Sequence, residues 1–491
     1  MSSNLIAFPP KASATVPLFI ESFLADAITP VVAFQRIRHL SKYAFLFESS
    51  EADSRLARFS IVGVDPKETL IFSKGKVEII DHLSSLSHSS SLLVDLESDP
   101  LSFLESRSLA APKPEQASLP ADFPFVAGYV GFLSYNAVSC FEAIPRQESD
   151  TLEVPDGIFS LFDALLIFDH KERTLHVVSM RSEEHVSELI AHLECQSYQK
   201  GRNLSSRVTK SVSTTDVKAS MSKEAFLSRV NNCKQFIEEG QVFQIVLAQR
   251  FFKSFDGDAF DIYRALQSIN PSPYGYFLQF PDFSYLGASP ERLLSSRNGQ
   301  LSLSALAGTR PRGRTAEEEV ELEIDLRSDE KEMAEHMMLV DLGRNDLGRV
   351  AKPGSVQCGE IARITRYGQV MHLTTDISAQ LASSSSSFDA ARSCFPAGTV
   401  SGAPKIRAME LLSELEPETR GIYSGLVGYF DLFGNMDSAI AIRSALVKDG
   451  EAHVTAGAGI VQDSIPEKEY EETRSKAASV LKAIAMAEAM Q

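Results

Sequence analysis

Tryptophan is absent from the 491 residues of this chain, and cysteine is scarce. The five cysteines are odd in number and widely spaced, and no two of them form a CxxC pair. This usage predicts neither a disulfide framework nor a zinc ribbon, so we expect a protein of the reducing cytoplasm. The cysteines are Cys140, Cys195, Cys233, Cys358 and Cys394.

Long apolar runs are also missing. No segment approaches the roughly 18–20 uninterrupted apolar residues of a transmembrane helix, so no membrane span is predicted. The N-terminal residues MSSNLIAFPPKASATVPLFIESF lack a basic segment followed by a clean apolar run. We therefore predict no signal peptide.

Basic residues are outnumbered, with 48 Lys and Arg against 65 Asp and Glu, and the formal net charge is −17. Because nucleic-acid binding needs a basic face, this balance argues against nucleic acid as the main partner. If the substrate is an anion, its positive surroundings must be built locally from Arg, Lys, backbone amides or a metal ion.

The chain is otherwise ordinary globular material, with 44% hydrophobic and 23% charged residues. A Ser-rich segment at 201–220 is the best linker candidate and divides the chain into residues 1–210 and 221–491. Short apolar segments predict strands in both parts, with helical segments between them, which favours an α+β fold with largely antiparallel sheets. The predicted strands are 45–49, 57–64, 69–74, 75–80, 157–170, 174–180, 242–252, 274–280, 283–289, 424–432, 436–447 and 451–461. The predicted helices are 182–199, 222–240, 315–342 and 466–488.

Two of the predicted helices carry carboxylates at the same interval. EMAEH places Glu332 and Glu335 three residues apart with His336 beside them, and EKEYEETRSK repeats the interval at Glu469 and Glu472. Each pair is compatible with an ordinary solvated helix face. If the helices face each other, the pairs form one site for a hard cation. Oxygen-only ligation would favour Mg²⁺, which keeps waters and bridges to anionic substrates.

Two segments rich in small residues are candidate ligand loops. In CFPAGTVSGAPK (394–405), successive backbone amides can form an anion-binding nest to which Thr399 adds a hydroxyl, and a tight loop without a ligand is equally open. In TAGAGIVQDS (455–464), Gly457 and Gly459 allow the backbone to approach a ligand closely, although one GxG is weak evidence.

Two single residues are ambiguous from their surroundings alone. IAIRSAL places Arg443 in an otherwise apolar strand, where its guanidinium needs a partner. A substrate carboxylate held by two hydrogen bonds and a structural salt bridge would both satisfy it. His372, in VMHL, reads by itself as a core histidine rather than as a base.

Five longer stretches are specific enough to compare with known families. They are LSLSALAGTRPRG (301–313), EHMMLVDLGRNDLGRV (335–350), YGQVMHL (367–373), FPAGTVSGAPK (395–405) and GAGIVQDSIPEKEYEETRSKA (457–477). Together and in this order they resemble the chorismate-utilising enzymes, and among these the anthranilate synthase component I group. The resemblance implies a sandwich of largely antiparallel sheets with helices covering the outside. It is dense over 225–485 and thinner before that.

The resemblance implies a metal site at the two carboxylate pairs. It predicts that Glu335 and Glu472 bind Mg²⁺ directly, while Glu332 and Glu469 support the ion through water or neighbouring contacts. The ion would neutralise the ring carboxylate of chorismate. The open question about the two helices is thereby answered in favour of one split site.

The resemblance also implies how the rest of chorismate is held. Arg443 and Tyr423 match the residues that hold the enolpyruvyl carboxylate. Gly457, Gly459 and Lys476 match the residues on the side of the ring carboxylate.

The implied reaction is the first committed step of tryptophan biosynthesis. Ammonia attacks C2 of chorismate while the 4-hydroxyl leaves, and pyruvate is then eliminated to give anthranilate. Glu291, in GASPERLL, matches the general acid that the leaving hydroxyl requires. His372 matches the base of the second step, with Thr399 nearby. The resemblance therefore predicts that His372 is a base rather than a core histidine.

Gln244 and Ala307 distinguish the chain from other chorismate-utilising enzymes. Water-using members carry a Lys base where this chain has Gln244, and because an amide cannot activate water in this way, ammonia is the favoured nucleophile. Many aminodeoxychorismate synthases have a Lys where ALAGT has Ala307. An aminodeoxychorismate synthase component is accordingly the runner-up.

The N-terminal part is predicted to be regulatory. FLFES resembles the element that binds feedback-inhibiting L-tryptophan, and NPSPY completes the pocket from the second part of the chain. The residues carried over are Glu48, Ser49, Asn270, Pro273 and Tyr274. The alternative is that FLFES is simply an edge strand. The lack of tryptophan residues fits an enzyme that is needed when tryptophan is scarce.

Ammonia needs a source. None of the five cysteines sits on the Gly-flanked elbow of a glutaminase nucleophile. We therefore expect a separate glutamine amidotransferase subunit (component II) and, by analogy, a heterotetramer with two copies of each subunit. Two readings from other classes stay open: a non-catalytic tryptophan or metal sensor, and a carboxylate-bridged redox protein.

Overall fold

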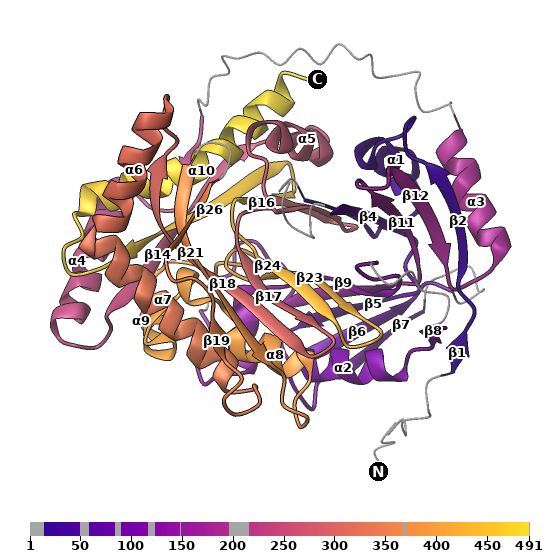
Figure 1. The fold of residues 1–491 in the computed structure, drawn as a ribbon, viewed down its shortest axis with the longest axis horizontal. Coiled ribbons are helices and arrows are strands. Elements are labelled where there is room, and N and C mark those ends of the chain that lie inside the picture. The colour runs from indigo at the N-terminus through magenta and orange to yellow at the C-terminus, as the bar shows by residue number, and fades with distance from the viewer. Residues whose placement is uncertain are drawn as a thin grey trace.

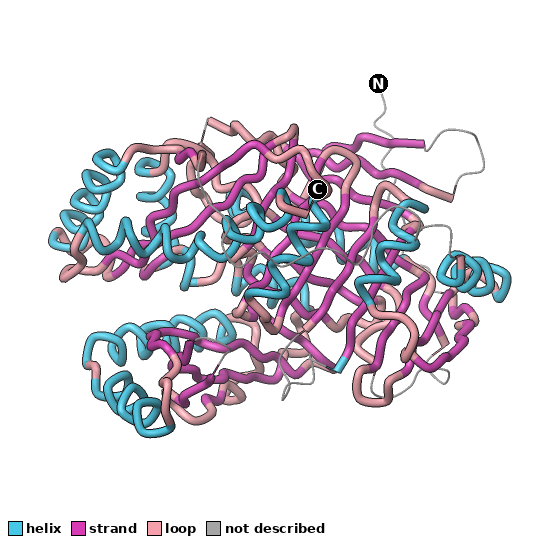
Figure 2. Tube along the Cα trace, turned by 90° about the horizontal axis from the view of Figure 1, so that it is seen from above, coloured by secondary structure: helices cyan, strands magenta, loops and turns pink. Residues whose placement is uncertain are grey.

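The computed structural model describes residues 14–49, 58–83, 90–115, 123–147, 149–195, 216–366 and 370–490. Within these residues the chain builds two sheets of twelve strands each, with helices over and around them (Figures 1 and 2). Every strand pair in the two sheets is antiparallel, whereas β1 (Thr15–Val16) and β8 (Lys113–Pro114) form a separate parallel pair. The predicted α+β class with largely antiparallel sheets is confirmed. Most of the predicted linker lies outside the described residues.

Sheet A, as we call it, contains strands from both ends of the sequence. Its spatial order is β13 (Lys218–Ala219), β14 (Gln244–Ser254), β26 (Glu451–Ile460), β25 (Ser444–Lys448), β16 (Phe283–Ser289), β15 (Tyr274–Gln279), β3 (Ala44–Glu48), β4 (Phe59–Val64), β11 (Ala164–Asp169), β12 (Thr174–Ser179) and β2 (Phe19–Leu24), with β22 (Gly402–Ala403) paired to β14.

Sheet B has the same mixed origin. Its order is β19 (Gln357–Cys358), β21 (Val370–Gln380), β18 (Gln300–Pro311), β17 (Arg292–Arg297), β24 (Met436–Ile440), β23 (Leu426–Asp431), β9 (Gly128–Leu133), β10 (Gly157–Phe162), β5 (Glu68–Ser73), β6 (Lys76–Asp81) and β7 (Ser90–Asp95), with β20 (Arg363–Arg366) paired to β21.

The helices cover the outer faces of the sheets. They are α1 (Pro30–Ile37), α2 (Pro100–Ala110), α3 (Glu183–Glu194), α4 (Lys223–Glu238), α5 (Ala259–Ile269), α6 (Ala316–Ser328), α7 (Glu330–Gly348), α8 (Ser387–Cys394), α9 (Lys405–Leu415) and α10 (Pro466–Glu488). Three short 3₁₀ segments lie in the connections between these elements: η1 (Arg38–Leu40), η4 (Tyr135–Cys140) and η6 (Gly398–Val400). Among the helices of the described residues, none combines the length and apolar composition that crossing a membrane would need.

Alternation along the strands explains why the core has several layers. In β3, Phe45 points into the cluster between the sheets, while Ala44 and Leu46 pack under α1 and α5 on the outer side. Successive side chains of a strand point to opposite faces, so a strand buried on both faces reads as a continuous apolar run. The interior between the sheets also holds Phe132 and Tyr276, which confirms the predicted sandwich.

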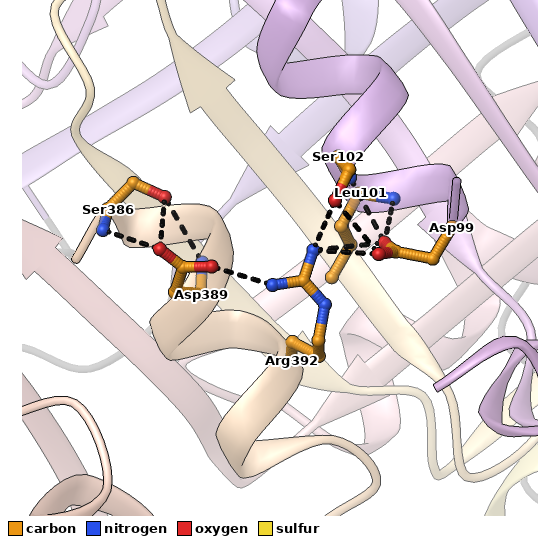
Figure 3. Close-up of polar contacts among 6 residues, drawn as sticks. All are labelled: Asp99, Leu101, Ser102, Ser386, Asp389 and Arg392. Carbon is orange, nitrogen blue, oxygen red and sulfur yellow. Dashed lines mark hydrogen bonds and ion pairs between the residues drawn. The ribbon is translucent and has the colours of Figure 1, made fainter. Parts of the chain in front are cut away.

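Both sheets join the two parts of the sequence. β9 lies between β10 and β23, and β3 pairs with β15, so strands from before and after the predicted linker are direct neighbours. A side-chain contact also joins the two parts of the chain. Arg392 of α8 donates hydrogen bonds at 3.0 Å to Asp99, the N-cap residue of α2 (Figure 3). The division into residues 1–210 and 221–491 is not a division between sheets. As a division of function it stays a prediction.

Three predicted elements are split in the structure, each at a polar residue. The helix predicted at 315–342 is broken at Asp329, which caps α7. The strand predicted at 157–170 passes from sheet B to sheet A at Asp163, whose carboxylate accepts a hydrogen bond from Arg181 at 2.8 Å. The strand predicted at 436–447 is interrupted at Arg443, where φ is +52°.

Candidate active site

A cavity of about 540 Å³ opens between the ends of the two sheets. Sheet A contributes β14 and β26 to its wall, sheet B contributes β18 and β21, and α7 and α10 face each other across it. The fourteen residues predicted for catalysis, substrate and metal all line this cavity. Because they come from segments far apart in the sequence, their meeting is a result of the fold. Their individual roles stay predictions.

The metal-site prediction concerns four carboxylates of α7 and α10. Burial raises the pKa of Glu335, and repulsion from Glu472 adds to this rise. Burial and neighbouring carboxylates likewise raise the pKa of Glu332 and Glu469. Converging acids that repel one another are stabilised by a cation.

The donor set at these helices contains carboxylate oxygens and no sulfur. Within the described residues, no three His, Cys, Asp or Glu side chains are arranged to enclose a metal ion. Two direct carboxylates, completed by water and by oxygens of the substrate, suit Mg²⁺, which seldom has an all-protein cage. Lys476, whose Nζ lies 2.7 Å from Glu472 Oε1, supplies positive charge at the same place.

His336 does not take part in this site, although EMAEH places it beside Glu335. It is fully buried on the core side of α7, and its Nε2 lies 2.7 Å from Thr375 Oγ1 on β21. Side chains at neighbouring positions of a helix point about 100° apart, so Glu335 and His336 lie in different surroundings.

Glu291 is suited to act as an acid. It precedes β17 and is 6% exposed, and burial raises its pKa to about 8, with Thr399 and Lys476 only partly offsetting the rise. A carboxyl group with this pKa is protonated at neutral pH. The Thr399 hydroxyl is itself buried and has no hydrogen bond of regular geometry in the described chain. It is therefore available to a ligand in the cavity.

His372 is held in a single neutral form. Its Nδ1 lies 2.8 Å from the Gly308 carbonyl, which can only accept, so this nitrogen carries the proton and Nε2 carries the lone pair. Burial lowers the pKa of His372, which keeps the ring neutral. Gly308 is at φ +64° in a β-bulge opposite His372, between Ala307 and Thr309. Sequence reasoning missed this bulge, although an isolated Gly in a strand is its usual signal.

Arg443 and Tyr423 provide an anion-binding corner. Within the described residues the Arg443 guanidinium forms no ion pair, and its Nη1 donates a hydrogen bond to the Lys476 carbonyl at 3.3 Å. Burial lowers the pKa of Arg443 and raises that of Tyr423. The structural salt bridge considered above is not found there. A largely buried arginine with this environment is ready to bind an anion.

The two glycines of β26 make room for other side chains of the site. A Cβ at Gly459 would lie 2.6 Å from Gln244 Nε2, and a Cβ at Gly457 would lie 3.1 Å from the Tyr423 hydroxyl. Gln244 in turn donates from Nε2 to Glu335 Oε1 at 2.9 Å, and its own Oε1 is buried without a partner in the described chain. The GAG sequence thus permits the close approach that was expected.

A second cavity of about 1240 Å³ lies elsewhere, between β3, β15 and β17. Glu48, Ser49, Pro273 and Tyr274 line it, whereas Asn270 caps the end of α5 and is not part of the wall. The four residues come from both parts of the chain. FLFES is accordingly an internal strand between β15 and β4, and the reading of an edge strand is wrong.

Polar side chains in the wall of this second cavity form hydrogen bonds with buried neighbours. Burial raises the pKa of Glu48, and the Tyr263 hydroxyl donates to its Oε2 at 2.6 Å. Tyr274 accepts from Arg292 Nε at 2.7 Å and donates to Asp437 Oδ1 at 3.0 Å. Sequence reasoning missed Tyr263, Arg292 and Asp437, because nothing in their local patterns signals a shared pocket.

Comparison with known proteins agrees with this geometry. The family model described as chorismate binding enzyme matches residues 42–482. Anthranilate synthase component 1 of Acetivibrio thermocellus is 39% identical over 481 residues, covering 96% of this chain and 95% of that protein. Its counterpart from Lactococcus lactis subsp. lactis (strain IL1403) is 38% identical, with 94% and 99% covered.

The fold comparison gives the same result. The crystal structure of anthranilate synthase component I from Streptococcus pneumoniae TIGR4 superposes with a TM-score of 0.74 at 35% identity, covering 93% of this chain and 98% of that chain. The chain therefore belongs to the chorismate-binding enzyme family, and within it to the enzymes of the anthranilate synthase component 1 group.

Proposed function

We propose that this chorismate-utilising enzyme aminates chorismate at C2 with ammonia and then eliminates pyruvate, so that anthranilate is released. The observation that carries the proposal is the content of one cavity: a carboxyl group kept protonated, a neutral histidine and a buried arginine without an ion-pair partner in the described chain. These are the groups that an elimination from a dicarboxylate requires.

The first chemical step depends on Glu291. The 4-hydroxyl of chorismate is a poor leaving group until it receives a proton, and the protonated Glu291 carboxyl supplies it as ammonia attacks C2. Arg443 and Tyr423 hold the enolpyruvyl carboxylate during this step. Gln244 is not a base, which is consistent with a nucleophile that arrives neutral.

The second step depends on His372. Removal of the proton at C2 allows pyruvate to leave and the ring to become aromatic. Nε2 of His372 carries the lone pair that takes this proton, because Nδ1–H is bound to the Gly308 carbonyl.

Mg²⁺ is the proposed cofactor, and Glu335 and Glu472 are the residues that would hold it. When bound there, the ion supplies positive charge against the ring carboxylate of the substrate. Glu332, Glu469 and Lys476 would balance the charge around it.

A separate glutamine amidotransferase is the proposed source of ammonia. Burial raises the pKa of Cys233 to about 12, and it raises the pKa of Cys394 as well. A glutaminase nucleophile needs the opposite shift. We propose a heterotetramer with two copies of each subunit.

Tryptophan is the proposed feedback inhibitor, and the second cavity is its proposed site. The proposal is supported by the wall of this cavity, which contains Glu48, Ser49, Pro273 and Tyr274, four of the five residues named by the resemblance. Inhibition follows if tryptophan favours a state in which the first cavity is less well arranged.

The test is a fluorescence assay of the purified chain with chorismate, Mg²⁺ and ammonium, with and without tryptophan. We expect anthranilate and pyruvate in equal amounts, suppression by tryptophan, and no turnover with glutamine alone. Anthranilate without suppression would remove the inhibitor proposal and keep the enzyme. Chorismate consumption without anthranilate would favour the aminodeoxychorismate product instead.

A further inference from the structure

A buried ion pair lies directly behind the candidate active site. Glu416 and Arg420 follow α9 and are 7% and 4% exposed. Arg420 donates to Glu416 through Nε at 2.8 Å and through Nη2 at 2.5 Å, in the two-pronged geometry that suits a guanidinium. Removing two charges from water is costly, so a buried pair of this kind is weak evidence for stability alone.

The remaining donors of Arg420 reach three separate segments. Nη2 also donates to the Val246 carbonyl at 2.6 Å, while Nη1 donates to the Val400 carbonyl at 2.6 Å and to Ser424 Oγ at 3.2 Å. A guanidinium has five N–H donors in a fixed plane, and every one of them has an acceptor here. Lysine has three donors on one nitrogen and cannot reproduce this pattern.

The segments that Arg420 joins are walls of the active-site cavity. Val246 lies on β14, two residues after Gln244, and Val400 ends η6, directly after Thr399. The Tyr423 ring, which lines the same cavity, has its centroid 5.9 Å from the Arg420 guanidinium. Each wall segment carries a predicted site residue, and one side chain connects all of them.

Glu416 completes the connection from the other side. Its Oε1 accepts a hydrogen bond from the Ala248 amide at 2.9 Å, so the pair contacts β14 at two points. The Tyr135 ring of η4 packs on the guanidinium with its centroid at 4.7 Å, and Gln147 Nε2 donates to the Glu416 carbonyl at 2.8 Å. The pair is therefore anchored by the first part of the chain.

We propose that Arg420 is a positioning residue, which together with Glu416 holds β14, η6 and Tyr423 in the arrangement that chorismate binding and turnover require. The proposal rests on the function proposed above. Arg420 touches no reacting atom, and it acts through the residues whose carbonyls and ring it fixes.

The neighbouring pair of Arg250 and Glu418 is a natural control. Arg250 is 8% exposed, forms an ion pair with Glu418 and donates to Thr151 Oγ1 at 2.6 Å. The residue types and burial resemble those of the first pair, but neither Arg250 nor Glu418 lines the cavity. Loss of stability is thereby separable from loss of positioning.

The experiment compares R420K with R250K in the full chain. We measure the melting temperature, chorismate affinity by calorimetry in the presence of Mg²⁺, and kcat and KM for ammonium-dependent anthranilate formation. R420K is expected to weaken chorismate affinity at least tenfold, with a higher KM and a lower kcat, while R250K stays within about twofold of wild type. Both variants are expected to lower the melting temperature to a similar extent.

A second pair of variants guards against failure of R420K to fold. E416Q keeps the oxygen that accepts from Ala248 and is expected to weaken chorismate affinity in the same direction, whereas E418Q is expected to leave it unchanged. Unaltered affinity and kinetics in E416Q or in folded R420K would overturn the positioning role, and so would equal losses in R250K. A wild-type chain that binds chorismate without forming anthranilate would overturn the proposed function, while the affinities would still decide the role of Arg420.

Discussion

At the scale of single residues, Glu291 links burial to the pH range in which the enzyme works. A general acid must be protonated, and its folded pKa of about 8 places the loss of that proton above neutrality. We expect kcat/KM, expressed per free ammonia, to be level below this pKa and to fall above it. Glu291→Gln removes the proton altogether and is expected to abolish turnover.

The Thr399 hydroxyl provides a check on this assignment. Because Thr399 partly offsets the raised pKa of Glu291, Thr399→Ala is expected to raise that pKa further. The falling limb of the pH profile then moves to higher pH, even though the maximal rate decreases. If the falling limb of the pH profile stays in place in Thr399→Ala, or moves to lower pH, the titrating group is not Glu291.

The metal proposal can be tested at two glutamates of the same helix. Glu335→Gln is expected to eliminate Mg²⁺-dependent activity and to weaken Mg²⁺ binding by calorimetry at least tenfold, because the amide cannot supply a charged ligand. The protein should stay folded, since burial already disfavours the ionised carboxylate. Glu332→Gln is the matched control, with a smaller expected effect. Unchanged Mg²⁺ binding in Glu335→Gln would remove this residue from the metal site.

The family resemblance named residues that the fold brings to one cavity, whereas local patterns left their surroundings open. Spacing brought Glu332 and Glu335 together on α7, but it could not tell that His336 turns into the core. Arg420 was missed because Glu416 lies four residues before it, which reads as an ordinary exposed helix pair. Only tertiary structure shows that this pair is buried and faces three segments of the cavity wall.

At the scale of elements, α10 was predicted at its observed bounds, whereas the helix predicted at 315–342 was wrong at its centre. Asp329 ends α6 and begins α7 there, and its Oδ1 accepts from the amides of Lys331 and Glu332 at 3.1 Å. Helical periodicity continues across such a junction, so the period alone does not reveal it. The extended backbone of Asp329, with φ −73° and ψ 104°, marks the break.

This cap leads to a prediction about α7. Asp329→Ala removes the acceptor for two amides of its first turn and is expected to lower the free energy of unfolding by about 1 kcal/mol. Because that turn carries Glu332 and precedes Glu335, half-maximal activity should need more Mg²⁺. Asp329→Asn keeps a capping oxygen and should resemble wild type in both respects. Urea denaturation and Mg²⁺ titration measure the effects, and equal behaviour of the two variants would exclude a role for the cap.

At the scale of the whole molecule, the two parts of the sequence contribute neighbouring strands to both sheets. Local pattern predicted the strands, yet it could not show that β9 would lie beside β23 or β3 beside β15, because pairing between distant strands leaves no local signal. The predicted regulatory and catalytic parts therefore share both sheets. The two cavities also meet along the chain, because Arg292, in the wall of the second cavity, directly follows Glu291 of the first.

We accordingly expect residues 216–491 to be insoluble when produced alone, since the edges of β15 and β23 would be exposed. Co-production with residues 1–215 as a separate chain should restore solubility and chorismate binding. Size-exclusion chromatography and calorimetry measure both outcomes. A soluble 216–491 fragment that binds chorismate by itself would show that the catalytic part is an independent domain.

The pairing of β9 with β23 also sets the order of events during synthesis on the ribosome. Gly128–Leu133 must wait for Leu426–Asp431, which emerges about 300 residues later. At the usual rate of about 5–20 residues per second, that delay is roughly 15–60 s. Throughout this time one edge of β9 has no permanent neighbour, although its other edge already pairs with β10, so we expect chaperones to shield that edge until the chain is almost complete.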